Sequence, residues 1–283
     1  MTQSAPHVQE VLDALRSAHG HDASAYDRRF LATAVAQRVE ARRASHDAAL
    51  TEGQYARALA EDPAEAAVLL HALRVTFSEF FRDPLAFALL EHRILPALAQ
   101  SRAGGELRVW SAGCALGQEA WSLAILLDEL RARTERAPSY RIFATDVSDA
   151  ALHMAREGAY DAVALRNARL GHVNAYFTAH GDTFVVAPRL RPHVTFAAYD
   201  MLDPHSGAPP ESLYGDFDLI LCCNLLFYFE AAARQRILGK LCSALAPGGY
   251  LVTGDVERDV VAEHEALRAV DVTSTVFRKR GPA

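Results

Sequence analysis

A glycine-containing turn and three polar side chains each follow a short apolar run in the last two-thirds of the chain. The turn spans residues 111–117, and the side chains are those of Asp146, Asp200 and Asn224. A carboxylate such as Asp146 can accept two hydrogen bonds from a ribose diol, and the Asp200 segment can read an adenine edge. The turn lacks the P-loop lysine and the GxGxxG spacing that bind phosphates. We therefore expect a nucleoside ligand without phosphates, and S-adenosyl-L-methionine is such a ligand.

The apolar runs that precede these side chains are predicted to be strands of one sheet. They alternate with predicted helices over residues 119–133, 149–156 and 231–245, the last of which ends in a stop and turn at 246–249. Such alternation favours an α/β fold with a doubly wound, mostly parallel sheet, which collects the carboxyl ends of its strands at one edge. The predicted strands cover residues 107–110, 140–145, 194–199, 217–222 and 250–253, and residues 272–279 could add a closing strand.

Other parts of the chain do not follow this alternation. Residues 1–100 carry apolar residues three and four apart and are predicted to form an all-α N-terminal domain. Gly104-Gly105 marks the boundary to a domain over 101–283. Within it, residues 160–192 are interpreted as an inserted antiparallel β-subdomain.

Each candidate residue also has a purely structural interpretation. Asp146 could cap the following helix, Asn224 could be a turn residue and Tyr228 a core residue. Arg82 could form a salt bridge with Asp83 or Glu79. These interpretations do not explain why four polar positions coincide with the ends of four successive predicted strands.

Composition narrows the possible partners and compartments. The formal net charge is −6, which gives no general attraction to nucleic acid, and no apolar run reaches the ~20 residues of a membrane span. The start of the chain lacks the layout of a secretory signal, so the cytoplasm is the expected compartment. The four cysteines form no CxxC pair and no HExxH spacing occurs, so we expect no metal.

Five segments together resemble the CheR-type chemotaxis-receptor protein-glutamate O-methyltransferases, over about residues 68–279. The segment most specific to this family is FFRDP at 80–84, because the shared class I methyltransferase fold alone would not produce it. The other segments are VWSAGCALGQEAWSLAI at 109–125, ATDVSDAALHMAREGAY at 144–160, FDLILCCNLLFYF at 217–229 and LAPGGYLVTGDVE at 245–257.

The resemblance implies S-adenosyl-L-methionine as methyl donor, S-adenosyl-L-homocysteine as product, and chemoreceptor glutamates as acceptors. It implies catalytic roles for Arg82, as a positioning cation, and for Tyr228, as an orienting hydroxyl. With the two glycines of the turn, the expected cofactor-binding residues are Thr76, Ser78, Arg82, Gly113, Gly117, Gln118, Glu119, Asp146, Asp200, Met201, Cys223 and Asn224. The sequence departs from the family pattern at several of them. Gln118 replaces the first acid of a usual Glu-Glu pair, and Cys223 stands where a basic residue is frequent.

The expected partner is the cytoplasmic helical bundle of a chemoreceptor, bound by a monomer. The arginines at 28, 29, 38, 42 and 43 could face that acidic bundle, or could be an ordinary solvated helix face. Because the connection between Phe177 and Thr183 is short, we expect no strong binding of a tethering C-terminal peptide. Two alternative functions stay open: a methyltransferase with another protein or small carboxylate as acceptor, and a catalytically silent cofactor-binding regulatory module.

Overall fold

The computed structural model describes residues 5–45, 47–212 and 215–281. The chain divides into two compact units, each with its own core. Unit 1 comprises Met1–Val75 and Phe227–Gln235, and unit 2 comprises Thr76–Leu226 and Arg236–Ala283. The predicted domain boundary at about residue 100 falls later than this division, because Phe80, Leu90 and Leu95 are buried in the core of unit 2.

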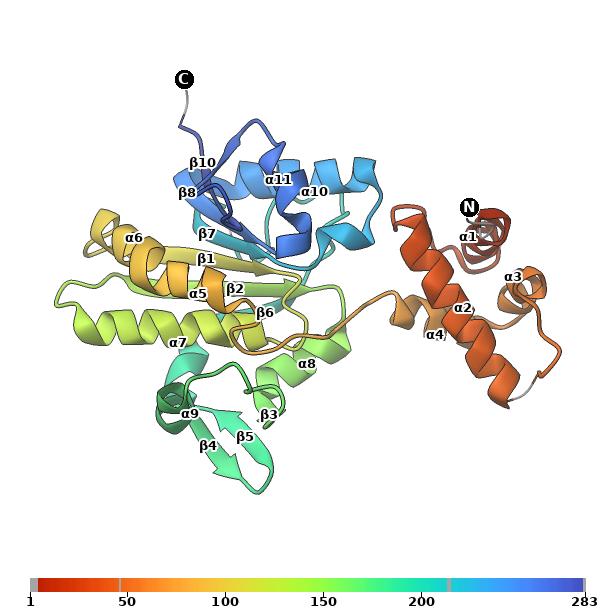
Figure 1. The fold of residues 1–283 in the computed structure, drawn as a ribbon, viewed down its shortest axis with the longest axis horizontal. Coiled ribbons are helices and arrows are strands. Elements are labelled where there is room, and N and C mark those ends of the chain that lie inside the picture. The colour runs from red at the N-terminus through yellow and green to blue at the C-terminus, as the bar shows by residue number, and fades with distance from the viewer. Residues whose placement is uncertain (1–4, 46, 213–214, 282–283) are drawn as a thin grey trace. The chain divides into compact units, whose positions relative to one another are not determined.

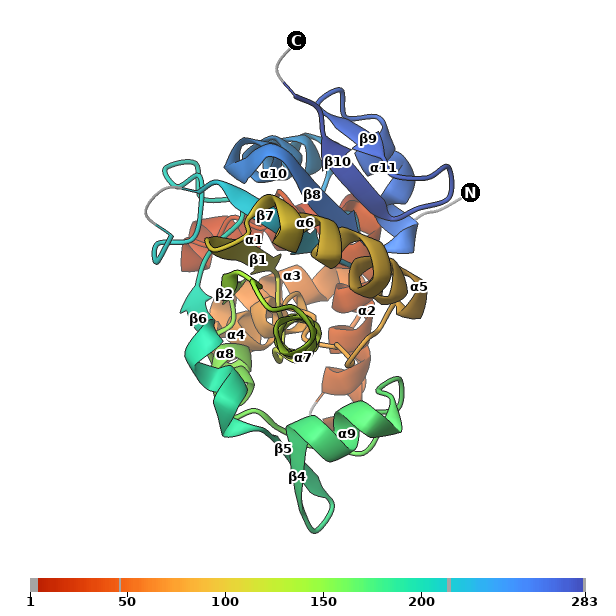
Figure 2. The same ribbon diagram turned by 90° about the vertical axis from the view of Figure 1, so that its left-hand side faces the viewer.

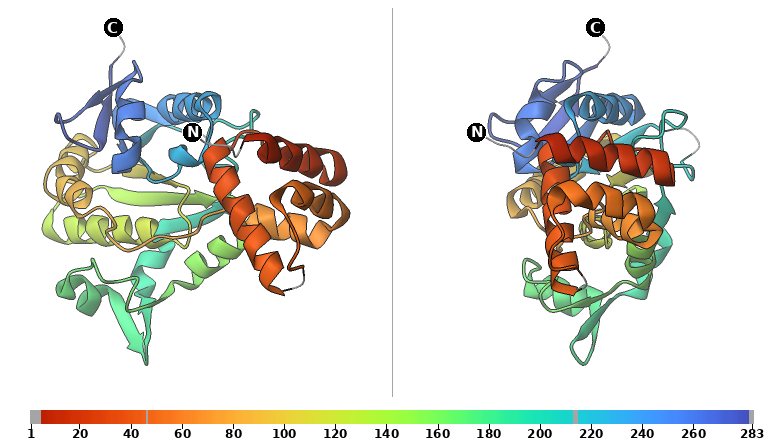
Figure 3. Two further views of the ribbon diagram at one scale, coloured as in Figure 1. Left: turned by 45° about the vertical axis from the view of Figure 1, so that its right-hand side comes forward. Right: turned by 90° about the vertical axis from the view of Figure 1, so that its right-hand side faces the viewer.

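The described residues of the N-terminal part of unit 1 form the helices coloured red to orange in Figure 3. Leu15, Leu31 and Leu59 are each at most 1% exposed and belong to its core. Asp62 caps the last helix by accepting hydrogen bonds from the backbone N–H groups of Ala64 and Glu65. The helical prediction is confirmed, with helices at α1 (Ala5–His19), α2 (Arg28–Ser45), α3 (Glu52–Glu61) and α4 (Pro63–Ala72).

Unit 2 is built on a seven-stranded sheet in the order β6-β2-β1-β7-β8-β10-β9. The first five strands in this order are parallel, and β10 runs antiparallel to both of its neighbours. The strand order reverses between β1 and β7, which is where a doubly wound sheet opens a ligand crevice. The predicted strands are confirmed as β1 (Glu106–Ala112), β2 (Ser139–Asp146), β6 (Val194–Ala198), β7 (Phe217–Cys222), β8 (Leu245–Thr253) and β10 (Val276–Lys279).

Two details at the end of the chain differ from the prediction. Strand β8 begins at Leu245, which pairs with Phe217 before the register shifts, so residues 246–249 lie within the strand instead of forming a separate turn. The short edge strand β9 (Leu267–Ala269) was not predicted. Its three residues are too few to show an alternating pattern.

Helices cover both faces of the sheet. The helices α5 (Pro84–Leu89), α6 (Leu95–Ser101) and α7 (Gln118–Arg133) lie along one face, and α10 (Ala231–Ala244) lies along the other (Figure 2). A π-helical turn at Leu90–Ile94 joins α5 to α6. The helix α8 (Asp149–Glu157) follows β2 and ends at Gly158, which adopts a left-handed conformation.

The predicted insertion forms a separate small sheet. Its strands are β3 (Ala159–Asp161), β4 (Phe177–His180) and β5 (Thr183–Val186), all antiparallel in the order β3-β5-β4. The hairpin of β4 and β5 extends away from the seven-stranded sheet, and α9 (Leu170–Tyr176) lies beside it (Figure 1).

Candidate active site

The turn after β1 is fixed by the end of β2. The backbone N–H groups of Gly113 and Cys114 both donate to the carbonyl oxygen of Thr145, at 2.8 and 2.9 Å. Gly113, Ala115 and Gly117 have φ values of 75°, 48° and 88°, in the left-handed region that favours glycine. The conformation is easily adopted by Gly113 and Gly117, whereas at Ala115 it is strained and is held by the hydrogen bond from the Ala115 N–H to Asp146.

The two glycines of this turn are needed for close packing. A Cβ atom at Gly117 would lie 2.8 Å from the Cβ of Ala155 and 3.1 Å from the ring of Phe196. A Cβ atom at Gly113 would lie 3.1 Å from the side chain of Leu225. The close approach that the structure shows is thus made by neighbouring protein groups, and approach of a ligand to these glycines stays a prediction.

Asp146 joins the ends of β1 and β2. One carboxylate oxygen accepts from Ala115 N at 2.9 Å and the other from Ser148 N at 2.9 Å. Ser148 caps α8 through its own hydroxyl, as the sequence indicated. A carboxylate oxygen can accept more than one hydrogen bond, so these contacts orient Asp146 and are compatible with binding a ribose diol.

Glu119 is the side chain at which several candidate residues meet. Its carboxylate accepts a hydrogen bond of 2.6 Å from the Ser111 hydroxyl and also interacts with the Cys223 thiol. The pKa of Glu119 is raised to about 7, chiefly by burial and also by the negative charge of Glu257, whereas the hydrogen bonds from Ser111 and Cys223 and the positive charge of Arg82 lower it. Arg82, Glu119 and Cys223, which the sequence analysis proposed from three distant segments, therefore lie within electrostatic range of one another.

Sequence reasoning missed a central residue of the site, Glu257. Its carboxylate is 1% exposed and accepts from the backbone N–H groups of Asn224, Leu226 and Gly254 and from the Thr253 hydroxyl. It thereby holds Asn224 at a φ of 58°. Burial raises the pKa of Glu257 despite these donors. The only sequence signal was an acid shortly after a predicted strand.

The environments of Gln118, Asp200 and Met201 differ from one another. Gln118 is 2% exposed, and within the described residues its Oε1 has no hydrogen-bond partner. Asp200 is exposed and accepts from Leu202 N at 2.8 Å, while Met201 is buried. The backbone N–H of Tyr199 donates to the carbonyl oxygen of Asp146 at 3.0 Å, which brings the Asp200 segment next to Asp146.

Arg82 is exposed and does not form the salt bridges that its structural interpretation required. Its guanidinium donates to the Phe77 carbonyl oxygen at 3.3 Å and lies over the Phe77 ring at 5.4 Å. Asp83 caps α5, and Glu79 pairs with Arg166. Thr76 and Ser78 are partly buried in the same irregular segment, at the start of unit 2.

Tyr228 belongs to unit 1. Its ring packs against Phe30 at 4.7 Å, and its carbonyl oxygen accepts from Asp27 N at 2.8 Å. Its predicted role as an orienting hydroxyl rests on the family resemblance.

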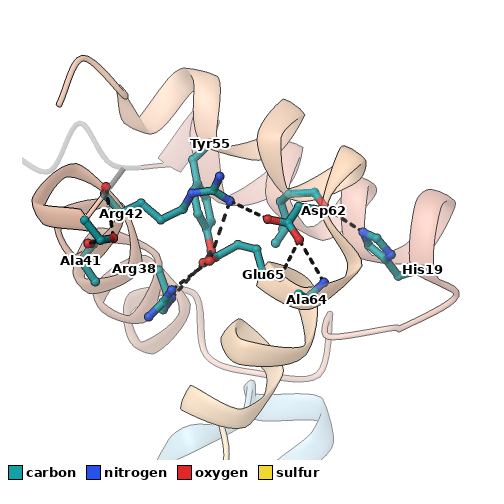
Figure 4. Close-up of polar contacts among 10 residues, drawn as sticks. His19, Arg38, Ala41, Arg42, Tyr55, Asp62, Ala64 and Glu65 are labelled. Carbon is teal, nitrogen blue, oxygen red and sulfur yellow. Dashed lines mark hydrogen bonds and ion pairs between the residues drawn. The ribbon is translucent and has the colours of Figure 1, made fainter. Parts of the chain in front are cut away.

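Two of the arginines proposed to face a receptor take part in an internal ion-pair cluster of unit 1. Arg38 donates to both oxygens of Glu65, at 2.9 and 2.8 Å, and Tyr55 donates to the same carboxylate at 2.7 Å (Figure 4). Arg42 donates to Asp62 at 3.2 Å. Because the Glu65 side chain is only 6% exposed, this cluster fixes α2 against α4.

The residues present fit an adenosyl cofactor. The buried Gln118 Oε1 without a partner and the Asp146 carboxylate both lie at the carboxyl ends of β1 and β2, beside the point where the strand order reverses. No cluster of metal-binding side chains occurs among the described residues. No helix in the described part of the chain is long and apolar enough to cross a membrane.

A family model described as the SAM-binding domain of CheR methyltransferases matches residues 76–276. The chain belongs to the CheR methyltransferase family. The match covers unit 2 almost completely and gives this unit the class I methyltransferase fold that its strand order indicates. The S-adenosylmethionine-binding activity and the methyltransferase class of this chain follow from that membership.

This chain is similar to several known proteins. Chemotaxis protein methyltransferase 1 of Pseudomonas aeruginosa is 34% identical over 194 residues, which cover 67% of this chain and 69% of the relative. An uncharacterized 104.1 kDa protein of Rhodobacter capsulatus is 34% identical over 204 residues, which cover 72% of this chain but 21% of that longer protein. Among solved structures, the N-methyltransferase NodS of Bradyrhizobium japonicum is 19% identical, with a TM-score of 0.39 over 75% of this chain and 98% of that chain.

Proposed function

We propose that this chain transfers the methyl group of S-adenosyl-L-methionine to glutamate side chains of chemoreceptors in chemosensory signalling. The observation that carries the proposal is the convergence of Arg82, Glu119 and Cys223 at the strand ends of a CheR-family domain. Relatives named chemotaxis protein methyltransferases support the chemotactic role. Under this proposal S-adenosyl-L-homocysteine is the second product, the protein acts as a cytoplasmic monomer, and no metal takes part.

A glutamate acceptor requires little proton chemistry. A free glutamate has a pKa near ~4.3 and is already ionised at neutral pH. The cofactor supplies an activated methyl group on a sulfonium. The task of the protein is to align the acceptor oxygen with that methyl group and to exclude water, and alignment can contribute on the order of 7–11 kcal/mol.

Each candidate residue is proposed to bind a different part of the cofactor or the acceptor. We propose that the Arg82 guanidinium holds a carboxylate, because its fork matches two carboxylate oxygens. Asp146 would bind the ribose, and Asp200 with Met201 the adenine edge. Glu119 and Asn224 would contact the amino-acid part of the cofactor, beside Cys223. Tyr228 would orient the acceptor glutamate.

The cytoplasmic helical bundle of a receptor is the proposed protein substrate. Arg38 and Arg42 already pair with acids of unit 1, so receptor contacts would come from other positions of α2, such as Arg29. Only Gly181 and Asp182 connect β4 to β5. We therefore keep the expectation that this hairpin does not bind a tethering peptide strongly.

Methylation of receptor fragments with a tritiated donor tests the proposal. We expect label that is released as methanol by base, because carboxyl methyl esters are base-labile, and a strongly reduced rate in Tyr228→Phe. Label that resists base, or label transferred only to small acids, would contradict the receptor-glutamate function. If Tyr228→Phe methylated the receptor fragments at the rate of the parent protein, only the orienting role of Tyr228 would be refuted.

A further inference from the structure

The loop that carries Arg82 is anchored on the inserted subdomain. The backbone N–H of Phe80 donates to the carbonyl oxygen of Ala164 at 3.1 Å. The Phe80 ring is fully buried and packs edge-to-face on Tyr160 and Phe177, with centroids 5.0 and 5.1 Å away. Tyr160 and Phe177 belong to β3 and β4 of the small sheet. The aromatic character of FFRDP is therefore explained by docking onto the insertion.

An ion pair strengthens this anchor one residue earlier. The Glu79 side chain is 5% exposed and forms a two-point ion pair with Arg166, in which the Arg166 Nε lies 3.0 Å from Oε2. The Asn167 amide donates to the same oxygen at 3.0 Å. A buried carboxylate is costly without such partners. Residues 166 and 167 of the insertion thus determine where Glu79 can lie.

Phe81, the residue directly before Arg82, is held in an unfavourable backbone conformation. Its φ is 51°, which is costly for a residue other than glycine and persists only where surrounding contacts enforce it. Its N–H donates to the Ser122 hydroxyl of α7 at 3.0 Å. Its ring stacks on His172 of α9, with centroids 4.9 Å apart. The backbone direction at Arg82 is therefore set from both sides.

We propose that the inserted subdomain is a positioning element for the cofactor site, and that Arg166 acts as a positioning residue by fixing the Glu79–Phe81 segment and thereby the Arg82 guanidinium. The inference rests on the proposed cofactor role of Arg82. It gives the insertion a function in this chain that does not need a tethering peptide. It also implies that any partner that displaces the insertion changes the affinity for the cofactor.

Arg166→Ala tests the inference, with Arg189→Ala as the matched control. Both arginines belong to the insertion and are more than half exposed. Arg166 pairs with Glu79, and Arg189 pairs with Asp128 of α7. Of these two arginines, Arg166 is the one that contacts the loop carrying Arg82, through Glu79. Calorimetric titration with S-adenosyl-L-homocysteine should show about tenfold weaker binding for Arg166→Ala and a change of less than about twofold for Arg189→Ala. Arg166→Lys, which keeps the charge, should recover part of the affinity.

Measured stability separates positioning from general damage. We expect Arg189→Ala to melt within a few degrees of the parent protein without ligand, because Arg189 is half exposed in its pair with Asp128. Arg166→Ala leaves the nearly buried Glu79 carboxylate with Asn167 as a donor and should melt lower, so the affinity is compared at a temperature at which each variant is fully folded. Unchanged affinity in Arg166→Ala, or an equal loss in Arg189→Ala, would overturn the inference. Failure of the proposed function would look different: the parent protein would bind the nucleoside but would not methylate receptor fragments.

Discussion

At the scale of single residues, the environment of Glu119 describes the candidate site best. Its carboxylate lies beside Ser111 and Cys223, within range of one positive charge, that of Arg82, and one negative charge, that of Glu257. Burial also raises the pKa of the Cys223 thiol, so this group stays protonated and uncharged at neutral pH.

Replacing Arg82 should abolish turnover and leave the fold intact. The side chain is exposed, and among the described residues its hydrogen bond and its ring contact are both with Phe77, so Arg82→Ala should change the free energy of unfolding by less than about 0.5 kcal/mol. Steady-state methylation and calorimetry with the nucleoside measure the functional loss. Methyl transfer near the parent rate would contradict the assignment of Arg82.

The raised pKa of Glu119 predicts a pH-dependent stability. The folded protein holds this proton up to about pH 7, whereas the unfolded chain releases it near 4.5, so stability falls as pH rises through this window. Glu119→Gln should remove this loss, which amounts to at most on the order of 3 kcal/mol. Thermal melting between pH 5 and 8 measures it, with the exposed Glu135→Gln as control. Parallel curves for the parent and Glu119→Gln would refute a Glu119 carboxyl that stays protonated up to about pH 7 in the folded protein.

At the scale of elements, the turn between β1 and α7 depends on Gly117. Gly117→Ala combines left-handed backbone strain with a contact of 2.8 Å to Ala155, and should cost about 2–4 kcal/mol of stability. Gly181→Ala is the control, because Gly181 also has a positive φ of 61° but no atom within 4 Å of its added Cβ, so it should cost about 1 kcal/mol. Chemical denaturation gives both values. Equal losses would show that close packing at Gly117 does not matter.

The elements that position the site could be predicted from the sequence because their signals are local. The apolar runs that end at Asp146 and Asn224 fixed both the strands and the edge where their polar residues meet. Glu257 could not be found this way, since two of its four donors come from the distant segment after β7 and the other two from the last residue of β8 and the residue that follows it. The partners of Arg38 likewise depend on how α2 and α4 pack, which no local pattern reveals.

At the scale of the whole molecule, the chain has two hydrophobic cores that belong to separate units. We expect two thermal transitions in calorimetry. S-adenosyl-L-homocysteine at 100 times its dissociation constant should stabilise the transition of unit 2 by about 2.7 kcal/mol. A single transition that the nucleoside does not shift would contradict this division.

The ion-pair cluster of unit 1 allows that unit to be perturbed alone. Glu65→Gln removes the charge that Arg38 and Tyr55 contact, and should cost about 2–4 kcal/mol because the carboxylate is nearly buried. Glu61→Gln is the control: its pair with Arg57 is exposed and should be worth less than about 1 kcal/mol. In Glu65→Gln, the transition that moves to a lower temperature than in the parent protein should be that of unit 1. Equal effects of the two substitutions would refute a structural role for the cluster.

The most direct test of the account is calorimetric titration of the parent protein and of Asp146→Ala with S-adenosyl-L-homocysteine. The account predicts one nucleoside per chain for the parent and at least tenfold weaker binding for Asp146→Ala, because the ribose loses its proposed acceptor at the end of β2. A parent protein that does not bind the nucleoside, or an Asp146→Ala variant that binds it as tightly as the parent, would contradict the central claim that these strand ends form the cofactor site.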